Sequence, residues 1–135
     1  MAEKELEKQY GNFTDMPVWQ RAHLLVLAVY ALSDNFPKKE TFALSDQIRR
    51  AVISITSNIA EGYGRRGFKD NCWFYTIAFG SLREVQNQII IAKDLGYIKE
   101  ADSTKLMIEA EEVVRLIYKL IANVKKRKSA APINY

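Results

Sequence analysis

This 135-residue chain is poor in the residues that disulfides and metal sites require. It contains one cysteine, Cys72, and one histidine, His23. A single cysteine cannot form an internal disulfide, which favours a reducing compartment. These two residues are also too few for a zinc site, and the chain has none of the Glu-x-x-His pairs that a di-iron bundle uses. We therefore expect no metal and no other cofactor.

Long apolar runs and proline-rich segments are missing as well. The most apolar stretch, 22–32, is far shorter than the roughly 20 residues that a membrane helix needs. The N-terminal stretch MAEKELEKQY is charged and lacks the apolar core of a secretion signal. With an apolar fraction of 48% and only three prolines, the composition is typical of a folded domain. The sequence predicts a cytoplasmic protein that does not associate with membranes.

Acidic residues are absent from the terminal run 125–128, KKRK, although the net charge of the chain is only +4. Arg49–Arg50 and Arg65–Arg66 form two further basic pairs. A basic excess favours anionic partners, nucleic acid above all. Cations are also common at the C-terminal end of a helix, where they interact favourably with its dipole. A purely structural role for the terminal run therefore remains an alternative.

Hydrophobic periodicity predicts an all-α fold, an up-down-up-down antiparallel four-helix bundle. We expect the bundle over 13–128, between a flexible N-terminal segment, 1–12, and a loose C-terminal tail, 129–135. Ser45, with Thr41 as an alternative, is the expected N-cap of the second helix, and Gly96 the stop of the third. The expected helices span 17–35, 45 to 62–64, 68–95 and 99–126.

The first three predicted helices have almost no charged face. Between residues 72 and 92 only Arg83 and Glu84 are charged, and between 18 and 33 only Arg21. A helix that is apolar nearly all round is buried on more than one side, whereas a simple bundle buries one stripe per helix. The sequence therefore predicts a homo-oligomer. It also predicts that most aromatic side chains lie inside, so that base stacking is not indicated.

Polar residues recur on the second and third predicted helices at helical spacing. One stripe consists of Arg50, Ser54, Asn58 and Glu61, which lie within about 80° of one another at about 100° per residue. A matching stripe consists of Gly80, Ser81, Glu84 and Gln88.

We expect these two stripes to meet in a buried polar seam. Arg49 or Arg50 should pair with Glu61 or Glu84, because buried charges are tolerated only when paired. Asn58 should bond backbone or amide groups. A glycine inside a helix costs about 1 kcal/mol relative to alanine, so Gly80 indicates the close approach of another backbone. The alternative is that the seam specifies packing and has no other role.

Two motifs lie on these helices: SNIAEG, 57–62, and GSLxE, 80–84. Together with Phe36–Pro37 and Gln47–Ala51, they resemble the four-helix-bundle proteins of the 23S rRNA intervening-sequence family, over roughly 13–125. Gly67, where the family often has a capping serine, and Phe79, where it often has a polar or basic side chain, depart from the pattern.

The resemblance implies an up-down helical bundle. The family is similar in fold to the accessory variability determinant of diversity-generating retroelements, a pentameric ring with a basic surface that works with a reverse transcriptase and nucleic acid. By this resemblance the chain is expected to form a homo-oligomer, with a pentamer as one form, and to contact RNA or DNA. An uncharacterised role is typical of the family.

Two hypotheses for the function follow. The first is an oligomeric RNA- or DNA-binding protein, whose binding is led by the phosphate backbone and depends steeply on salt. The second is a protein-interaction scaffold that recruits a partner enzyme such as a reverse transcriptase. The residues expected to bind nucleic acid in the first hypothesis are Arg65, Arg66, Lys69, Lys125, Lys126, Arg127 and Lys128.

Catalytic residues are not expected. A Cys72–His23 nucleophile pair is conceivable, but a cysteine in a tryptophan-containing helical segment is more typical of an inert thiol. Gly62, Gly64 and Gly67 lack the strand-to-helix context of a phosphate-binding loop. Glu61 and Glu84 have arginines nearby, which favours structural pairing over acid-base chemistry. The sequence therefore predicts a protein that is not an enzyme.

Overall fold

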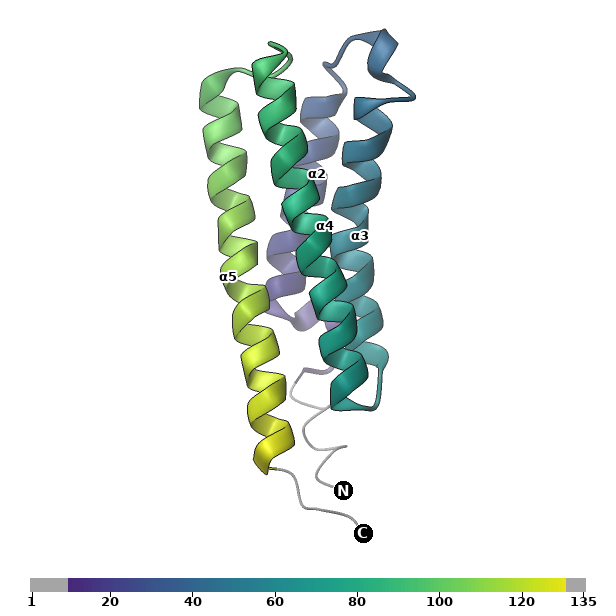
Figure 1. Ribbon diagram of the computed structural model, residues 1–135, viewed down its shortest axis with the longest axis vertical. Helices are drawn as coiled ribbons and strands as arrows, with labels where there is room; N and C mark the ends of the chain where they lie inside the picture. Colours follow the sequence, from purple (N-terminus) through teal and green to yellow (C-terminus); the bar gives the residue numbers. More distant parts are fainter. Residues whose placement is uncertain (1–9, 131–135) are drawn as a thin grey trace.

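The computed structural model describes residues 10–130, which form four long α-helices and two short 3-10 helices, with no strand among them. Each α-helix packs against the next one in the chain, and the last packs back against the first, as Figure 1 shows. The predicted all-α, up-down-up-down bundle is confirmed. The elements are η1 (Phe13–Asp15), α2 (Pro17–Ser33), η2 (Lys38–Glu40), α3 (Leu44–Gly64), α4 (Phe68–Asp94) and α5 (Glu100–Ala130).

The core lies along the axis of the bundle and is built from aliphatic side chains of all four α-helices. The predicted inner face of α3 is confirmed, because Ile48, Val52, Ile55 and Ile59 are each at most 2% exposed. Burial of one such side chain stabilises the fold by about 1.5–3 kcal/mol. Their fully buried neighbours on the other helices are Leu25, Val29, Leu82, Val85, Ile89, Val113 and Ile117.

The predicted helix starts at Pro17 and Phe68 and the predicted end of α3 near Gly64 are confirmed, whereas the start of α3 and the end of α5 depart from the prediction. α2 begins at Pro17, which has no N–H to leave unsatisfied there. The predicted cap at Ser45 is wrong, because α3 begins at Leu44 with Ala43 as its N-cap residue. Ser45 is buried instead.

The two predicted terminal segments are only partly within the described residues. α5 continues through Ala130, so the expected loose tail does not begin at Ser129. At the other terminus, the carbonyl oxygen of Tyr10 accepts a hydrogen bond of 2.6 Å from the Tyr63 hydroxyl. This contact ties the end of the predicted N-terminal segment to α3. Residues 1–9 and 131–135 lie outside the described part of the chain.

The outer faces of the helices carry large apolar side chains. On α2, Leu24 is 58% and Leu27 54% exposed, and on α3, Ile53 is 41% exposed. On α4, Ile77 is 37% and Trp73 65% exposed. The apolar surplus in the sequence therefore lies on the outside of this single chain. Within residues 10–130, no helix combines the length and the apolar character that crossing a membrane would require.

Candidate nucleic-acid interface

The two groups of predicted basic residues lie at the same end of the bundle. Arg65 and Arg66 follow the end of α3, and Lys69 lies in the first turn of α4. The terminal run 125–128 lies in the last turns of α5, which ends beside the α3–α4 turn (Figure 1). Up-down topology brings these distant segments together. We call this the basic end; its cations are Arg65, Arg66, Lys69, Lys125, Lys126, Arg127 and Lys128.

The α3–α4 turn, which carries Arg65 and Arg66 and precedes Lys69, is held by the buried side chain of Asn71. Its amide Nδ2 donates a hydrogen bond to the carbonyl oxygen of Gly62 and another, of 2.8 Å, to that of Arg65. These carbonyls lie at the C-terminus of α3, where a helix leaves its last carbonyls without intrahelical partners. Asn71 thus closes α3 and fixes the start of α4. The sequence did not single out this residue.

Gly62 permits the close packing of α3 on α4 beside this turn. A Cβ at position 62 would lie 2.5 Å from a ring carbon of Tyr75 and 3.1 Å from the Cβ of Phe74. The Tyr75 ring is only 3% exposed, so it has little room to shift. Burial raises the pKa of the Tyr75 hydroxyl well above its usual range, and the positive charge of Arg127 partly opposes this shift.

The cations of the basic end differ in their exposure and in the contacts that they already make within the chain. Arg65 pairs with Glu61 at 3.3 Å and lies over the Phe74 ring, 4.6 Å from its centroid. The Arg127 side chain is half-buried. Arg66, Lys69, Lys125, Lys126 and Lys128 are all exposed. Exposed cations outside ion pairs are the groups that a phosphate backbone neutralises most readily.

An open hollow separates α4 from α5 at the basic end. Its volume is about 300 Å³, and Lys69 and Lys125 contribute to its wall. Trp73 belongs to the same wall and is 65% exposed. Trp73 is therefore an exception to the expectation that most aromatic side chains lie inside. We call this site the Trp73 hollow; its lining residues are Lys69, Asp70, Cys72, Trp73, Thr76, Ile121 and Lys125.

The sequence contained a signal for this site that the prediction did not use. Lys69 and Trp73 are four residues apart, and residues at this spacing share one face of a helix. The apolar character of the segment after Cys72 favoured burial on all sides. Periodicity was too weak in that segment to show which aromatic residue faces outward.

The predicted polar seam between α3 and α4 forms at its centre. The hydroxyl oxygens of Ser54 and Ser81 are 2.8 Å apart and form a hydrogen bond between the two helices. The amide of Asn58 donates to the carbonyl oxygen of Ser54 at 2.8 Å and to its hydroxyl at 3.0 Å. The expectation that Asn58 bonds a backbone group is confirmed.

The predicted charge pairs of the seam are wrong. Arg49 pairs with Asp34 of α2 at 2.7 Å, and Arg50 pairs with Asp46 on its own helix at 3.0 Å. The expected partner Glu61 pairs with Arg65. All these pairs are at least partly exposed, and such pairs contribute about 0–1 kcal/mol each.

Away from its centre, the seam contains a polar atom without a hydrogen bond among the described residues. The Gln88 amide donates to Glu84 at 3.4 Å, but its own Oε1 is buried without a hydrogen-bond partner in the described residues. A Cβ at Gly80 would meet nothing within 4 Å. The close backbone approach expected at Gly80 is therefore not made by any of residues 10–130.

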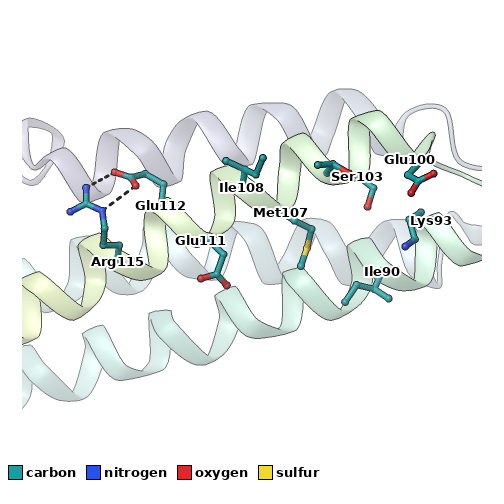
Figure 2. A pocket seen from close by; sticks show the side chains of 10 residues that line it. Ile90, Lys93, Glu100, Ser103, Met107, Ile108, Glu111, Glu112 and Arg115 are labelled. Atoms are coloured by element: carbon teal, nitrogen blue, oxygen red, sulfur yellow. Dashed lines mark hydrogen bonds and ion pairs between the residues drawn. The ribbon is translucent and has the colours of Figure 1, made fainter.

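A larger groove runs between α4 and α5 nearer the opposite end of the bundle. Its volume is about 760 Å³, and its apolar lining includes Ile90, Met107 and Ile108. Figure 2 shows Ile90 of α4 and Met107 of α5 between the two helices. Glu112 and Arg115 form an ion pair on α5 beside these side chains. The groove offers an apolar surface with a charged rim.

Two glutamates of this groove, Glu111 and Glu112, have carboxyl groups whose pKa is lowered. Hydrogen bonds from Gln86 and Arg83 lower the pKa of Glu111, and a hydrogen bond from Arg115 lowers the pKa of Glu112. A carboxyl group with a lowered pKa is a poor proton donor at neutral pH. The arrangement therefore favours a structural role for these carboxylates over general acid catalysis.

The two residues of the nucleophile pair weighed from the sequence, His23 and Cys72, lie in different surroundings. His23 of α2 stacks on Trp19 with ring centroids 4.8 Å apart, whereas Cys72 lines the Trp73 hollow. Within residues 10–130, no three of the histidine, cysteine, aspartate and glutamate side chains group as a metal site would need.

Comparison with known proteins identifies the fold and then the family. One similar solved structure is a protein of unknown function from the S23 ribosomal protein family of Bacteroides thetaiotaomicron, with a TM-score of 0.72 and 20% sequence identity. The match covers 78% of this chain and 95% of that one, and at this identity it shows a shared fold. No curated protein matches the chain. The family model described as 23S rRNA-intervening sequence protein matches residues 14–119, most of the bundle, and the chain belongs to this family.

Proposed function

We propose that this protein is a non-enzymatic, cytoplasmic homo-oligomer that binds RNA through the basic end of each bundle. The observation that carries the proposal is the convergence of the α3–α4 turn and the last turns of α5, which places seven cations at one end. The family's link to an intervening sequence of 23S rRNA makes RNA the first nucleic acid to test.

The electrostatics of the basic end support this proposal. Glu61 is engaged with Arg65, and Asp70 is the acidic residue in the first turn of α4. No ion pair among the described residues engages Arg66, Lys69, Lys125, Lys126 or Lys128. Each phosphate that a cation neutralises releases counterions, which makes binding favourable at low salt and weak at high salt.

Exposed apolar side chains support assembly of several copies. Leu24 and Leu27 of α2 lie on a different helix from Ile53 of α3 and Ile77 of α4, so apolar surface faces outward on more than one side. Where exposed apolar side chains of neighbouring helices adjoin, they form the kind of patch that marks protein interaction sites. A ring of copies, with five as the number that the family resemblance implies, would multiply a modest basic surface and add avidity.

Gly80→Ala tests the assembly. If no partner covers Gly80, alanine should stabilise the chain by up to about 1 kcal/mol, because it is the better helix former. If another copy packs against Gly80, the added methyl group should shift the assembly toward monomers in analytical ultracentrifugation. Assembly predicts the second result; a wild-type protein that sediments as a monomer at micromolar concentration would contradict it.

RNA binding is tested by fluorescence anisotropy with a labelled RNA at several salt concentrations. The affinity of the wild-type protein should fall steeply between about 50 and about 200 mM salt. Reversal of charge at Lys69, Lys125 and Lys126 by glutamate should abolish measurable binding. All three side chains are exposed, so the variant should keep its fold.

The opposite end of the bundle supplies the matched control. Lys38 and Lys39 of η2 are exposed there, and Lys105 on α5 is a third exposed lysine outside the basic end. Their replacement by glutamate changes the net charge by the same amount. If this control variant loses as much affinity as the basic-end variant, or if wild-type protein fails to bind RNA at low salt, the proposed function is wrong.

The α4–α5 groove favours a second candidate function, the scaffold that recruits a partner enzyme. Its apolar lining by Ile90, Met107 and Ile108 fits an apolar helix face of another protein. This candidate predicts that a purified reverse transcriptase binds with little dependence on salt. Ile108→Asp, at a 65% exposed position, should abolish that binding and leave RNA affinity unchanged.

A further inference from the structure

We propose that the Trp73 hollow holds an unpaired base of the bound nucleic acid, so that the basic end prefers single strands to duplexes. This inference rests on the proposed function and deepens it, because it names the form of nucleic acid that the basic end selects. It depends on the surroundings of one exposed tryptophan.

Trp73 shares an open site with two cations. Lys69 stands one helical turn before it on α4, and Lys125 lines the same hollow from α5. The indole is 65% exposed, and the volume of the hollow, about 300 Å³, is at the lower end of the range for small-ligand sites. Aromatic rings that stack on bases and lysines that contact phosphates are the two components of single-strand binding sites.

The remaining walls of the hollow fit a flat apolar group. Cys72 and Ile121 contribute apolar atoms, and the Thr76 hydroxyl already donates a hydrogen bond of 2.7 Å to the carbonyl oxygen of Cys72. The carboxylate of Asp70 also lines the hollow, so the phosphates are expected on the lysine side. The site therefore recognises the face of a base, and this predicts little preference for base identity.

A subunit contact is the competing explanation for the exposed indole. Packing another copy over Trp73 would also cover Lys69 and Lys125, and buried cations need acidic partners. The bases of a duplex are stacked on one another and offer no free face. An unpaired nucleotide supplies both a free face and a negative charge, and thus matches all three side chains.

Trp19 and Phe42 show how Trp73 differs from the other aromatic residues. The Trp19 ring is already stacked on His23, with centroids 4.8 Å apart. Phe42 is 95% exposed and follows Lys38 and Lys39 closely in sequence, but it lies at the opposite end of the bundle and lines none of the hollows described above. Phe42 is therefore a control for an exposed aromatic ring near lysines.

The experiment compares Trp73→Phe with Trp73→Leu in the full-length protein. Phenylalanine keeps a ring for stacking, whereas leucine keeps only apolar volume. Anisotropy is measured with a short oligouridylate, with a duplex of the same length, and with inorganic polyphosphate, which has the charge but no bases. Phe42→Leu is the matched control at the opposite end.

We expect wild-type protein to bind the single strand more tightly than the duplex. Trp73→Leu should weaken single-strand binding about tenfold, Trp73→Phe should largely retain it, and polyphosphate binding should be unchanged in both. In a Trp19→Phe background, where Trp73 is the remaining tryptophan, the single strand should quench the fluorescence and polyphosphate should not.

Three outcomes would overturn this inference and leave the proposed function standing. The first is equal affinity for single strand and duplex. The second is salt-dependent RNA binding that Trp73→Leu does not change. The third is dissociation of the assembly by Trp73→Leu in ultracentrifugation, which would make Trp73 a subunit contact. If none of the three probes binds in a salt-dependent manner, the proposed function itself is rejected.

Discussion

At the basic end, a side chain holds the turn between α3 and α4. At the opposite end, a special backbone conformation forms the turn between α4 and α5. Asn71 holds the first turn by bonding two carbonyl oxygens. Gly96 makes the second, with a φ of 81°. The N–H of Gly96 donates to the Lys93 carbonyl oxygen at 2.9 Å, and that of Tyr97 to the Ala92 carbonyl oxygen at 2.8 Å, which is a Schellman motif.

The two ends also differ in charge. Around Gly96, cations alternate with acids: Lys93 lies 3.8 Å from Asp94, and Glu100 and Asp102 begin α5. Around Asn71, cations dominate. A mixed surface has little net attraction for a polyanion, whereas a surface of one sign attracts it over a Debye length of about 10 Å. The buried amide of Asn71 therefore fixes a turn among charges of mainly one sign, whereas Gly96 forms a turn among charges of both signs.

Asn71→Ala should have the largest effect on stability. It removes the donor to two carbonyl oxygens in a buried turn, and we expect a loss of about 2–4 kcal/mol in the free energy of unfolding. RNA affinity should fall as well, because the turn positions Lys69. Urea unfolding followed by circular dichroism measures the loss.

Asn87→Ala, at an exposed position on the same helix, is the matched control. It should change stability by less than about 0.5 kcal/mol. If Asn71→Ala were equally mild, the side chain would not be what holds the turn.

Gly62→Ala should come next, with a loss of about 1–3 kcal/mol from overpacking against Tyr75 and Phe74. Gly64→Ala, two residues later, should be neutral or slightly stabilising, because a Cβ there would meet nothing within 4 Å. Thermal unfolding of both variants tests the difference. Equal melting temperatures would mean that α3 and α4 are not in close contact at the basic end.

Gly96→Ala should destabilise the opposite end by about 1–2 kcal/mol, because a side chain strains the left-handed backbone conformation. Gly96→Asn should lose less, since asparagine tolerates this region better. Neither substitution should alter RNA affinity measured by anisotropy. A loss of RNA affinity in either variant would contradict the proposal that only the basic end binds RNA.

Alkaline pH should weaken the packing at the basic end by a smaller amount. The pKa of the Tyr75 hydroxyl is raised in the folded state. The stabilising contribution of this group is therefore complete below the pKa of the unfolded chain and is lost as pH rises from that value through the folded pKa. Between about pH 9 and about pH 11, the wild-type protein should lose about 1 kcal/mol more than Tyr75→Phe. Tyr118→Phe, which changes a 56% exposed ring, should behave like wild type in the same urea titrations.

The sequence was sufficient for the architecture because the inner face of α3 is regular. Ile48, Val52, Ile55 and Ile59 repeat at helical spacing and are all buried. The meeting of Ser54 with Ser81 was also predictable, since both interrupt otherwise apolar helices. Up-down topology then placed both basic segments at one end.

The partners of individual side chains could not be predicted in this way. Helical spacing places Arg49 on a face but does not say whether α2 or α4 lies beside it, and its partner proved to be Asp34 of α2. Trp73 belongs to a segment that is apolar nearly all round, so periodicity did not show that it faces outward. The role of Asn71 depends on carbonyl groups that only the folded α3–α4 turn brings within reach.

Lysine footprinting of the wild-type protein tests the difference between the two ends most directly. The rate of acetylation of each lysine is measured by mass spectrometry with and without a saturating single-stranded RNA at low salt. We predict that RNA protects Lys69, Lys125 and Lys126 and leaves Lys38 and Lys39 as reactive as before. Protection of Lys38 and Lys39 instead, or equal protection at both ends, would contradict the assignment of RNA binding to the basic end.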